Sequence, residues 1–567
     1  MRTSELVDAD ASPARRSRGP VSFGHSALSS VRRALGSLCT PEPVPEPFEA
    51  GESRLARALL WPGVVGTFGS LLVLWGASQP TSPFTLNHAT LKTLSDPALQ
   101  YGVRLWYFGT GAPIGNVLVG VVAVYTGMFL MMRAWVALAR LTRLHPGTPV
   151  RRFVPVFIAW MLPLLVVAPL FSHDAFSYVA QGEEMTRHIN PYLYPPSLLG
   201  PGGNPFASLV DKLWANSTSP YGPIFLTLAG GIVALVNHNE LEALLGFRFL
   251  AVVGVVLLGI YMPRLARSYG FDAAKSFVLV ALNPLVLLHL VAGEHNDALM
   301  MGLLVAGLAL ARERHPLLGI VVCSLAALVK VPALVGVVYI GWDWAGVGVS
   351  WRSRVRPLAK AAALSGATMV AVTYAIGLGW GWVAALSNPA SVSSWMDPAT
   401  GIGGLVARIV NGVGLGEHAP TIVAVARWVG LSAAAGVAVW LLLRSDGGVG
   451  SFRGLGLTML TVVVLGPVVQ PWYLVWGLVL LAPLVEGRAR SALVLASAVL
   501  SFLGLPGGRM LLGRLAGDGP LVLLDALAVL AAVGLVSFAP RLYQLAKQRR
   551  DEPGHGAGDL AAPGERA

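Results

Sequence analysis

Apolar residues occur along this chain in long blocks that short polar stretches separate. A straight helix needs roughly 20 apolar residues to cross the hydrocarbon core of a bilayer, and many of the blocks approach that length. The blocks lie near residues 57–78, 113–136, 153–171, 222–237, 245–262, 276–292, 297–312, 316–329, 331–348, 358–378, 420–443, 455–469, 471–486, 491–505 and 519–538. They predict an all-α polytopic membrane protein with a bundle of roughly 13–15 transmembrane helices.

The composition supports a membrane location and excludes a soluble protein. Of the 567 residues, 54% are hydrophobic and only 12% are charged, whereas soluble domains carry about 25% charged residues. The net charge of +12 does not indicate nucleic-acid binding, because Arg and Lys gather in short stretches between apolar blocks. This distribution is the positive-inside pattern of membrane proteins.

The two ends of the chain differ from its middle. Residues 1–56 are polar, basic and rich in Pro, and residues 548–567 are also polar, so both are expected to be disordered tails. The membrane domain is therefore expected over residues 57–547. Placing the basic stretches inside makes both termini cytoplasmic and exposes the loop 172–221 on the outer face of the plasma membrane.

One part of this topology has two solutions. Three apolar blocks lie between Arg152 and Arg264, and an odd number of crossings cannot return the chain to the same side. Either the short block 222–237 does not cross the bilayer fully, or Arg264 and Arg267 are external.

The predicted external loop begins with a candidate catalytic carboxylate, Asp174. From Asp174 onward the apolar residues fall near one helical face, with Gln181 and Glu184 toward the other. This pattern is typical of a helix that lies on the membrane interface, and Asn190-Pro191 would end it. Asp174 caps this helix through its side chain, acts as a catalytic base, or does both, because the two roles do not exclude each other.

Two further polar stretches interrupt the apolar sequence. Glu294–Asp297 are four consecutive polar residues, and a simple turn between two helices needs neither a His nor a pair of acids. Lys330 interrupts an apolar run, where a Lys costs at least roughly 2.5–3.5 kcal/mol and should face a polar cavity or a partner. Lys330 either snorkels to the interface or neutralises a phosphate, and Pro332 indicates a helix break beside it.

A third polar stretch, Gln470-Pro471-Trp472-Tyr473, breaks another pair of apolar blocks on the same side. Its aromatic residues are explained either by the aromatic belt of membrane proteins or by docking of sugar rings on aromatic faces. Some familiar signatures are absent: no Gly-Lys pair occurs, hence no Walker A loop, and neither HExxH nor GxSxG is found. A nucleotide-driven pump and the common hydrolases are therefore not expected.

Five motifs, in order along the chain, resemble those of one family. They are SHDAFSYVAQG with the NPY that follows it, SPYGP, NPLVLLHLVAGEHNDALMMGLLVAG, AALVKVPA and QPWYLVWGL. From about residue 55 to about residue 540 the chain resembles the polyprenol-phosphate-mannose-dependent α-1,6-mannosyltransferases of mycobacteria and corynebacteria, which belong to the GT-C class. The resemblance implies elongation of the mannan backbone of lipomannan and lipoarabinomannan. Glu294 departs from the pattern, since a second Gly is expected there.

The resemblance also implies roles for individual residues. Asp174 is implied as the catalytic base, and Lys330, Arg187 and His295 are candidates for binding the donor phosphate. Candidate substrate-binding residues are Tyr178, Tyr221, Glu294, Asn296, Asp297, Gln470, Trp472 and Tyr473. No cofactor is implied, and His295 with Asp297 is a weak ligand set for a divalent cation, so no metal site is expected.

The implied chemistry needs one base and one cation. A sugar on a phosphate diester already has a good leaving group, so this transfer needs no second carboxylate as acid, unlike glycoside hydrolysis. Asp174 would accept the proton of the acceptor hydroxyl, and Lys330 would stabilise the departing phosphate. The expected partners are polyprenyl-phosphate-mannose, a lipid-anchored mannan acceptor and the membrane, without nucleotide or nucleic acid.

Three alternatives are open on the sequence alone. A GT-C transferase for another lipid-linked sugar or acceptor would use the same residues. A transporter or flippase would use Lys330 and His289 as substrate or proton-relay residues inside the membrane, and it would not require Asp174 in an external loop. A non-catalytic scaffold for cell-wall assembly is the third alternative.

Overall fold

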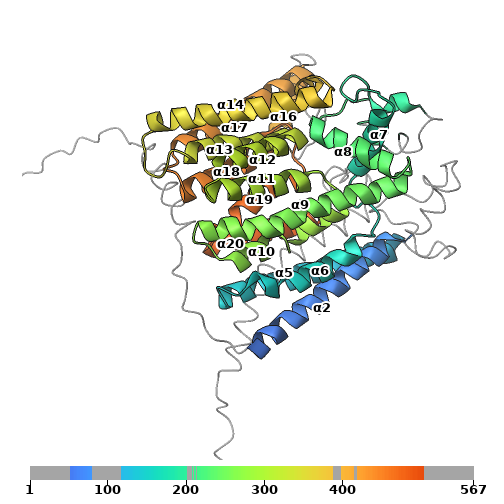
Figure 1. Ribbon diagram of the computed structural model, residues 1–567. Coiled ribbons are helices and arrows are strands. Elements are labelled where there is room, and N and C mark those ends of the chain that lie inside the picture. The colour runs from blue at the N-terminus through green and yellow to red at the C-terminus, as the bar shows by residue number, and fades with distance from the viewer. Residues whose placement is uncertain are drawn as a thin grey trace, which may run out of the picture.

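The fold is helical throughout the part of the chain that the computed structural model describes. That part comprises residues 52–79, 117–200, 214–386, 397–413 and 418–503, together with residues 207, 210 and 211. Its longer helices, most of them labelled in Figure 1, are α2 (Glu52–Ala77), α5 (Val117–Leu144), α6 (Val154–Leu164), α7 (Asp174–Thr186), α8 (Pro223–Leu235), α9 (Glu240–Ser268), α10 (Ala273–Val280), α11 (Asp297–Arg312), α12 (Pro316–Val329), α13 (Leu334–Asp343), α14 (Trp351–Ile376), α15 (Gly381–Ala385), α16 (Pro398–Gly412), α17 (Ala419–Leu443), α18 (Val449–Leu465), α19 (Pro471–Leu481) and α20 (Gly487–Ser501). These residues contain no strand, which confirms the predicted all-α class.

Among the described residues, five helices are long and apolar enough to cross a membrane, which confirms a polytopic membrane protein. They are Leu55–Ala77, Val119–Leu144, Leu241–Ser268, Trp351–Ile376 and Ala419–Leu443. Six further apolar helices are shorter: Val154–Leu164, Pro223–Leu235, Pro316–Val329, Val331–Asp343, Val449–Leu465 and Pro471–Leu481. The predicted span 519–538 and the predicted tails lie outside the described residues, except that α2 already begins at Glu52.

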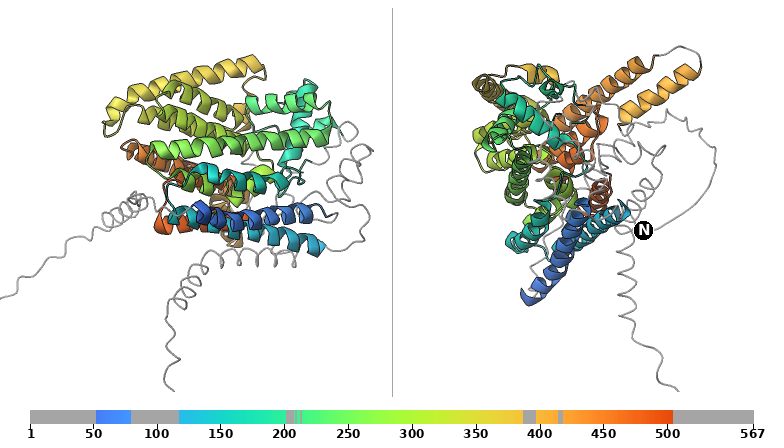
Figure 2. Two further views of the ribbon diagram at one scale, coloured as in Figure 1. Left: turned by 60° about the horizontal axis from the view of Figure 1, so that its bottom comes forward. Right: turned by 90° about the vertical axis from the view of Figure 1, so that its right-hand side faces the viewer.

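The helices lie side by side, with α2 and α5 along one edge and α14 along the other (Figure 1). α7 and α8 gather at one end of the bundle, which is called the α7 end below. α16 and α17 form a hairpin that projects from the bundle, as the right-hand view of Figure 2 shows. Only 11% of the most apolar stretch of α17 is buried, so this helix requires lipid around it.

Two apolar blocks are broken inside the bundle. The block 276–292 does not form one α-helix: α10 ends at Val280, and a π-helix (η4) covers Val286–Ala292. Lys330 is extended, with φ −155° and ψ 121°, between α12 and a 3-10 turn over Val331–Ala333 (η5), so the break predicted beside Pro332 is confirmed. Non-helical backbone at membrane depth is tolerated only inside the protein or along a polar cavity, and π-helices often occur at functional sites.

α7 is a helix that ends before the Asn190-Pro191 pair, as predicted, but its polar residues do not face water. Gln181 and Glu184 are both buried. Gln181 accepts a hydrogen bond from the Ser219 hydroxyl at 3.0 Å, whereas burial raises the pKa of Glu184 to about 8. Glu184 is therefore an uncharged carboxyl at neutral pH, which lowers the cost of burying it.

α9 and α11 pack with their backbones in contact. A Cβ atom at Gly254 would lie 2.2 Å from the carbonyl carbon of Ala298, and one at Gly302 would lie 2.4 Å from the carbonyl oxygen of Gly254. Small residues allow membrane helices to approach this closely. The contact fixes the position of α11, whose first residue is Asp297, against α9.

Substitution of Gly254 by Val is expected to destabilise the bundle. The added side chain must displace the α11 backbone, and overpacking of this kind typically costs about 1–3 kcal/mol or more. The unfolding temperature of the purified protein in detergent should therefore fall clearly. Gly366→Val is the matched control, because no atom lies within 4 Å of a Cβ at that position, and an equal loss in both variants would contradict the packing argument.

Candidate active site

Segments far apart in the sequence meet at the α7 end. The Leu170 N–H donates to the Ala292 carbonyl at 3.0 Å, which joins the approach to α7 to the end of the π-helix. The Gly222 N–H donates to the Val329 carbonyl at 3.1 Å, which joins the start of α8 to the end of α12 beside Lys330. These bonds bring three of the predicted polar stretches to one place.

The turn between the π-helix and α11 supplies four of the predicted site residues. Glu294 has a φ of 57°, a left-handed conformation that residues with side chains rarely adopt. Asp297 is the first residue of α11, where the helix dipole favours a carboxylate. Glu294, His295, Asn296 and Asp297 are all buried, so each must be paired within the protein or with a ligand.

Lys330 forms a bidentate ion pair with Asp297. Its Nζ atom lies 2.9 and 2.8 Å from the two carboxylate oxygens of Asp297, and the indole N–H of Trp476 donates to the same carboxylate at 2.7 Å. The ammonium also lies 4.4 Å from the ring centre of Tyr473. Lys330 is thus held by a carboxylate and aromatic rings, with 13% of its side chain exposed, and does not simply snorkel to the interface.

Asp174 lies against His295 from the turn before α11. The closest approach, between Oδ2 of Asp174 and Nδ1 of His295, is 3.4 Å, and 19% of the Asp174 side chain is exposed. Burial favours the protonated form of Asp174, but the attraction of His295 and Lys330 outweighs it and lowers the pKa of the carboxyl below its ordinary value. Asp174 is therefore an ionised, accessible carboxylate at neutral pH.

The interpretation of Asp174 as a side-chain helix cap is wrong. His173 occupies the N-cap position of α7, and it makes no side-chain capping bond. Asp174 is instead the first residue of the helix, and its own backbone N–H donates to the Ser172 hydroxyl at 3.0 Å. The carboxylate is consequently free of a capping role and faces His295.

Trp472 from the start of α19 holds the His295 ring in place. The two rings are stacked, with centroids 3.9 Å apart and an interplanar angle of 16°. Trp472 is buried, so it is not a residue of the exposed aromatic belt. Tyr473 stacks in turn on Trp476 at 4.8 Å, which orders the rings that surround Lys330.

Several buried polar atoms at this cluster have no hydrogen-bond partner among the described residues. They are Nε2 of His295, both polar side-chain atoms of Asn296, Oε1 of Gln470 and Nε1 of Trp472. Buried polar groups are normally satisfied, and a group of exceptions needs a reason. These donors and acceptors are suited to a ligand rich in hydroxyl groups, such as a sugar. The described residues contain no group of three or more His, Cys, Asp or Glu that could hold a metal ion.

The two predicted tyrosines lie beside the same cluster. Tyr178 and Tyr221 make an edge-on contact with ring centroids 5.2 Å apart, and the Lys330 ammonium lies 6.0 Å from the Tyr221 ring centre. Burial and the Asp174 carboxylate raise the pKa of Tyr221 well above its ordinary value. Tyr221 therefore stays a neutral phenol that can donate a hydrogen bond.

Arg248 and Glu294 form a fully buried ion pair behind the cluster. Besides the Glu294 carboxylate, the Arg248 guanidinium binds three carbonyl oxygens. They belong to Leu164 at the end of α6, to Val167 just after it, and to Ala292 at the end of the π-helix. Breaking such a pair leaves an uncompensated charge in the interior. Glu294, the departure from the family pattern, is thus bound to a structural arginine.

The structure does not bring Arg187 to the cluster. Arg187 follows the last residue of α7, pairs with Glu183 at 2.7 Å and is 42% exposed. The length of α7 separates it from Asp174 by about 20 Å, at about 1.5 Å per residue.

Sequence reasoning also missed two residues of this region, Arg248 and Trp476. A charge inside the apolar block 245–262 was a usable signal for Arg248, because such charges are rare and are paired. Trp476 lies three residues after Tyr473, hence on the same helix face.

The fold and the site define a polytopic membrane protein whose broken helices present a polar, charged site at one end of the bundle. Residues 63–346 match the family described as "Alpha-(1->6)-mannopyranosyltransferase, N-terminal domain", and residues 399–538 match the "MptB C-terminal domain". The chain belongs to this family, which confirms the resemblance seen in the five motifs.

Three relatives named as alpha-(1->6)-mannopyranosyltransferases align with most of this chain. An alpha-(1->6)-mannopyranosyltransferase B of Corynebacterium glutamicum is 31% identical over 497 residues, which cover 81% of this chain and 78% of the relative. An alpha-(1->6)-mannopyranosyltransferase of Mycobacterium tuberculosis is 30% identical over 542 residues, covering 85% and 87%. An alpha-(1->6)-mannopyranosyltransferase A of Mycobacterium tuberculosis is 32% identical over 414 residues, covering 70% and 77%.

The Arg248–Glu294 pair is expected to stabilise the fold cooperatively. Glu294→Gln leaves a buried guanidinium without its counterion, which typically costs about 3–5 kcal/mol. The double variant Arg248→Gln/Glu294→Gln should lose clearly less than the sum of the two single variants in a double-mutant cycle of unfolding free energies. Glu313→Gln is the control, because the Arg264–Glu313 pair is partly exposed to solvent and should contribute less than about 1 kcal/mol. Strict additivity would contradict the coupling.

Proposed function

We propose that this protein is an inverting mannosyltransferase that moves mannose from polyprenyl-phosphate-mannose to an α-1,6-mannan acceptor of the lipomannan or lipoarabinomannan type. The α7 end would face the outside of the plasma membrane. Family membership supports mannosyl transfer, and a site at the end of membrane helices supports a lipid-linked donor. The observation that carries the proposal is the accessible Asp174 carboxylate, paired with His295 at 3.4 Å, beside the Lys330 ammonium.

Among the three acids of the cluster around His295, which are Asp174, Glu294 and Asp297, Asp174 is the one suited to act as a base. Glu294 is bound to Arg248 in the interior. Asp297 is only 1% exposed and accepts bonds from Lys330 and Trp476. Asp174 is partly exposed and ionised, and a general base must be within reach of the proton that it accepts.

Lys330 is suited to bind the phosphate of the donor. An ammonium has three donors, and two directions are used by the oxygens of Asp297. The third donor can reach a phosphate oxygen. Because Asp297 neutralises Lys330 in the absence of substrate, the charge is tolerated at this depth and is still available as the leaving group gains negative charge.

The reaction follows from these positions. The acceptor hydroxyl oxygen attacks the anomeric carbon of mannose while Asp174 accepts the hydroxyl proton. A new C–O bond forms to the acceptor, the bond between the anomeric carbon and the phosphate oxygen breaks, and polyprenyl phosphate leaves with the bonding electron pair. Lys330 stabilises the charge on that phosphate. Attack opposite the leaving group converts a β-linked donor into an α-mannoside.

Residues around Asp174 and Lys330 would recognise the sugar and position the base. His295 orients the Asp174 carboxylate and is itself stacked on Trp472. The unsatisfied amide of Asn296 and the carbonyl oxygen of the Gln470 side chain would bind mannose hydroxyls, because both are buried without partners among the described residues. Arg187 is not assigned to the donor phosphate in this arrangement, since it lies at the far end of α7.

The proposal is tested by incubating the purified protein with radiolabelled polyprenyl-phosphate-mannose and defined α-1,6-mannoside acceptors. The expected product is an acceptor longer by one mannose, whose new linkage is removed by an α-1,6-specific mannosidase. Binding of the donor without any mannoside product, or its movement across a vesicle membrane instead, would refute the proposal and support a transporter.

Asp174→Asn is expected to abolish most of the turnover without destabilising the protein. Asn keeps the size of the side chain, and no capping bond is lost, so expression and unfolding temperature should match the wild type. Loss of the general base should lower turnover on the order of 10²-fold or more, with donor binding retained. Glu313→Gln, which removes a partly exposed carboxylate at the other end of α11, should keep full turnover. Normal turnover in Asp174→Asn would show that another group is the base.

His295→Gln is expected to move the acid limb of the pH–turnover profile to higher pH. His295 is the largest of the influences that lower the pKa of Asp174, and without it burial raises that pKa, so the carboxylate becomes protonated at a higher pH than in the wild type. The wild-type profile should be flat from neutral pH to well below pH 6, because a carboxyl with a lowered pKa stays ionised there. His238→Gln, at a half-exposed position that contacts Glu183, is the control and should leave the profile unchanged. An unshifted acid limb in His295→Gln would remove His295 from its positioning role.

A further inference from the structure

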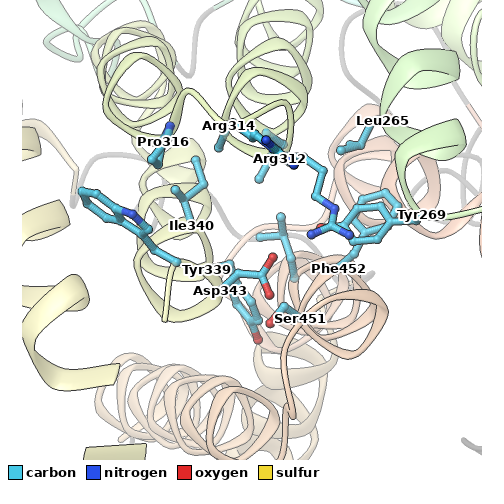
Figure 3. Close-up of a pocket in the computed structure, with 14 residues that line it drawn as sticks. Leu265, Tyr269, Arg312, Arg314, Pro316, Tyr339, Ile340, Asp343, Ser451 and Phe452 are labelled. Atoms are coloured by element: carbon cyan, nitrogen blue, oxygen red, sulfur yellow. The ribbon is translucent and has the colours of Figure 1, made fainter. Parts of the chain in front are cut away.

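A cavity of about 330 Å³ lies at the opposite end of α11 from the candidate active site. α11 starts at Asp297 and ends at Arg312 after 16 residues, so about 24 Å separates its two ends, at about 1.5 Å per residue. The cavity is lined by the ends of α9, α11 and α13 and by the start of α18, and Figure 3 shows its labelled side chains. None of these residues takes part in the proposed transfer reaction.

The cavity has positive side chains on one wall and a negative side chain on another. Arg312 and Arg314 come from the end of α11 and the loop after it, whereas Asp343 comes from the end of α13. Figure 3 shows the Arg312 guanidinium and the Asp343 carboxylate extending into the cavity from different sides. Within the described part of the chain, no ion pair shorter than 4 Å joins the two.

Both groups are positioned before any ligand arrives. The Arg312 guanidinium lies 4.7 Å from the ring centre of Tyr269, and Tyr269 is itself stacked on Phe452 with an interplanar angle of 8°. One oxygen of Asp343 accepts a hydrogen bond from the Gly448 N–H, which leaves the other oxygen for a ligand. Stacking of a guanidinium on an aromatic ring fixes the direction of its donors.

The surroundings of the cavity are those of a membrane surface. Leu317, which follows Pro316 of the cavity wall, is 57% exposed, and Trp351 at the start of α14 is 59% exposed. An exposed Trp and several Arg residues beside exposed aliphatic side chains are typical of the headgroup level of a bilayer. Apolar residues such as Leu308 and Ile340 form the remaining walls, which suits the glycerol and first methylene groups of a lipid.

We propose that this cavity binds the headgroup of a zwitterionic aminophospholipid in the leaflet opposite the candidate active site. The phosphate diester would accept charge-assisted hydrogen bonds from Arg312 and Arg314, and the ammonium group would donate to Asp343. A free phosphate ion or a purely anionic headgroup would place a negative charge near Asp343 without compensation. The separated charges of the cavity thus favour a ligand that carries both signs.

The test uses the full-length protein in detergent and measures its unfolding temperature against the concentration of three probes. They are short-chain phosphatidylethanolamine, short-chain phosphatidylglycerol and inorganic phosphate. A ligand of the folded state raises the unfolding temperature as its concentration exceeds its dissociation constant. Phosphatidylethanolamine should bind most tightly, phosphatidylglycerol more weakly, and inorganic phosphate should cause no specific shift. Equal or tighter binding of phosphatidylglycerol, or equal stabilisation by inorganic phosphate, would overturn the proposal.

Two variants separate the roles of the charges. Arg312→Gln should weaken the binding of both lipids about tenfold or more, the effect of losing a hydrogen bond to a charged group. Asp343→Asn keeps an acceptor for the Gly448 N–H and should weaken only phosphatidylethanolamine, so that the preference over phosphatidylglycerol disappears. Arg356→Gln removes an exposed arginine of the same end, in α14, and should change neither affinity. If Arg312→Gln does not fold, Asp343→Asn alone decides, and an unchanged lipid preference in that variant refutes the proposal.

Discussion

The buried ion pair between Arg248 and Glu294 is the constraint on which the arrangement of the α7 end depends. A guanidinium in the interior of a membrane bundle must be neutralised, and its donors must all find acceptors. Arg248 meets most of this requirement by binding Glu294 together with carbonyl groups from the end of α6 and the end of the π-helix. Its Nε atom alone has no partner among the described residues. Glu294 reaches Arg248 from a left-handed turn. The conformation of the turn is thereby fixed, and the turn carries both His295 and Asp297.

As a result of this constraint, the three carboxyl groups that lie close together at this site have different electrostatic roles. Glu294 neutralises a buried arginine, Asp297 neutralises Lys330, and only Asp174 keeps an accessible carboxylate. Environments that differ in burial and charge give chemically identical groups different tasks. Two of the acids thus maintain the charge balance of the interior, and the third, Asp174, remains accessible.

The sequence alone predicted the helical class, the break at Lys330 and the gathering of the polar stretches at one end. Each of these depends on a local signal: the length of the apolar blocks, the position of Pro332, and charged residues inside apolar sequence. The sequence did not predict the π-helix, since the mostly apolar block 276–292 carries no pattern that distinguishes a π-helix from an α-helix. The burial of Gln181 depends on how α8 covers α7, which no local pattern encodes. The distance of Arg187 from Asp174, in contrast, follows from the length of α7. The exact partner of each acid is likewise a property of tertiary packing.

α11 shows why the two ends of the bundle can serve different purposes. Its first residue, Asp297, and its last, Arg312, both carry the charge that complements the helix dipole. At the α7 end that charge is buried and paired with Lys330, so the interaction acts in a water-poor environment where it is strong. At the other end Arg312 is exposed and stacked on Tyr269. The same electrostatic rule therefore stabilises both ends of α11, although one end is buried and the other is exposed.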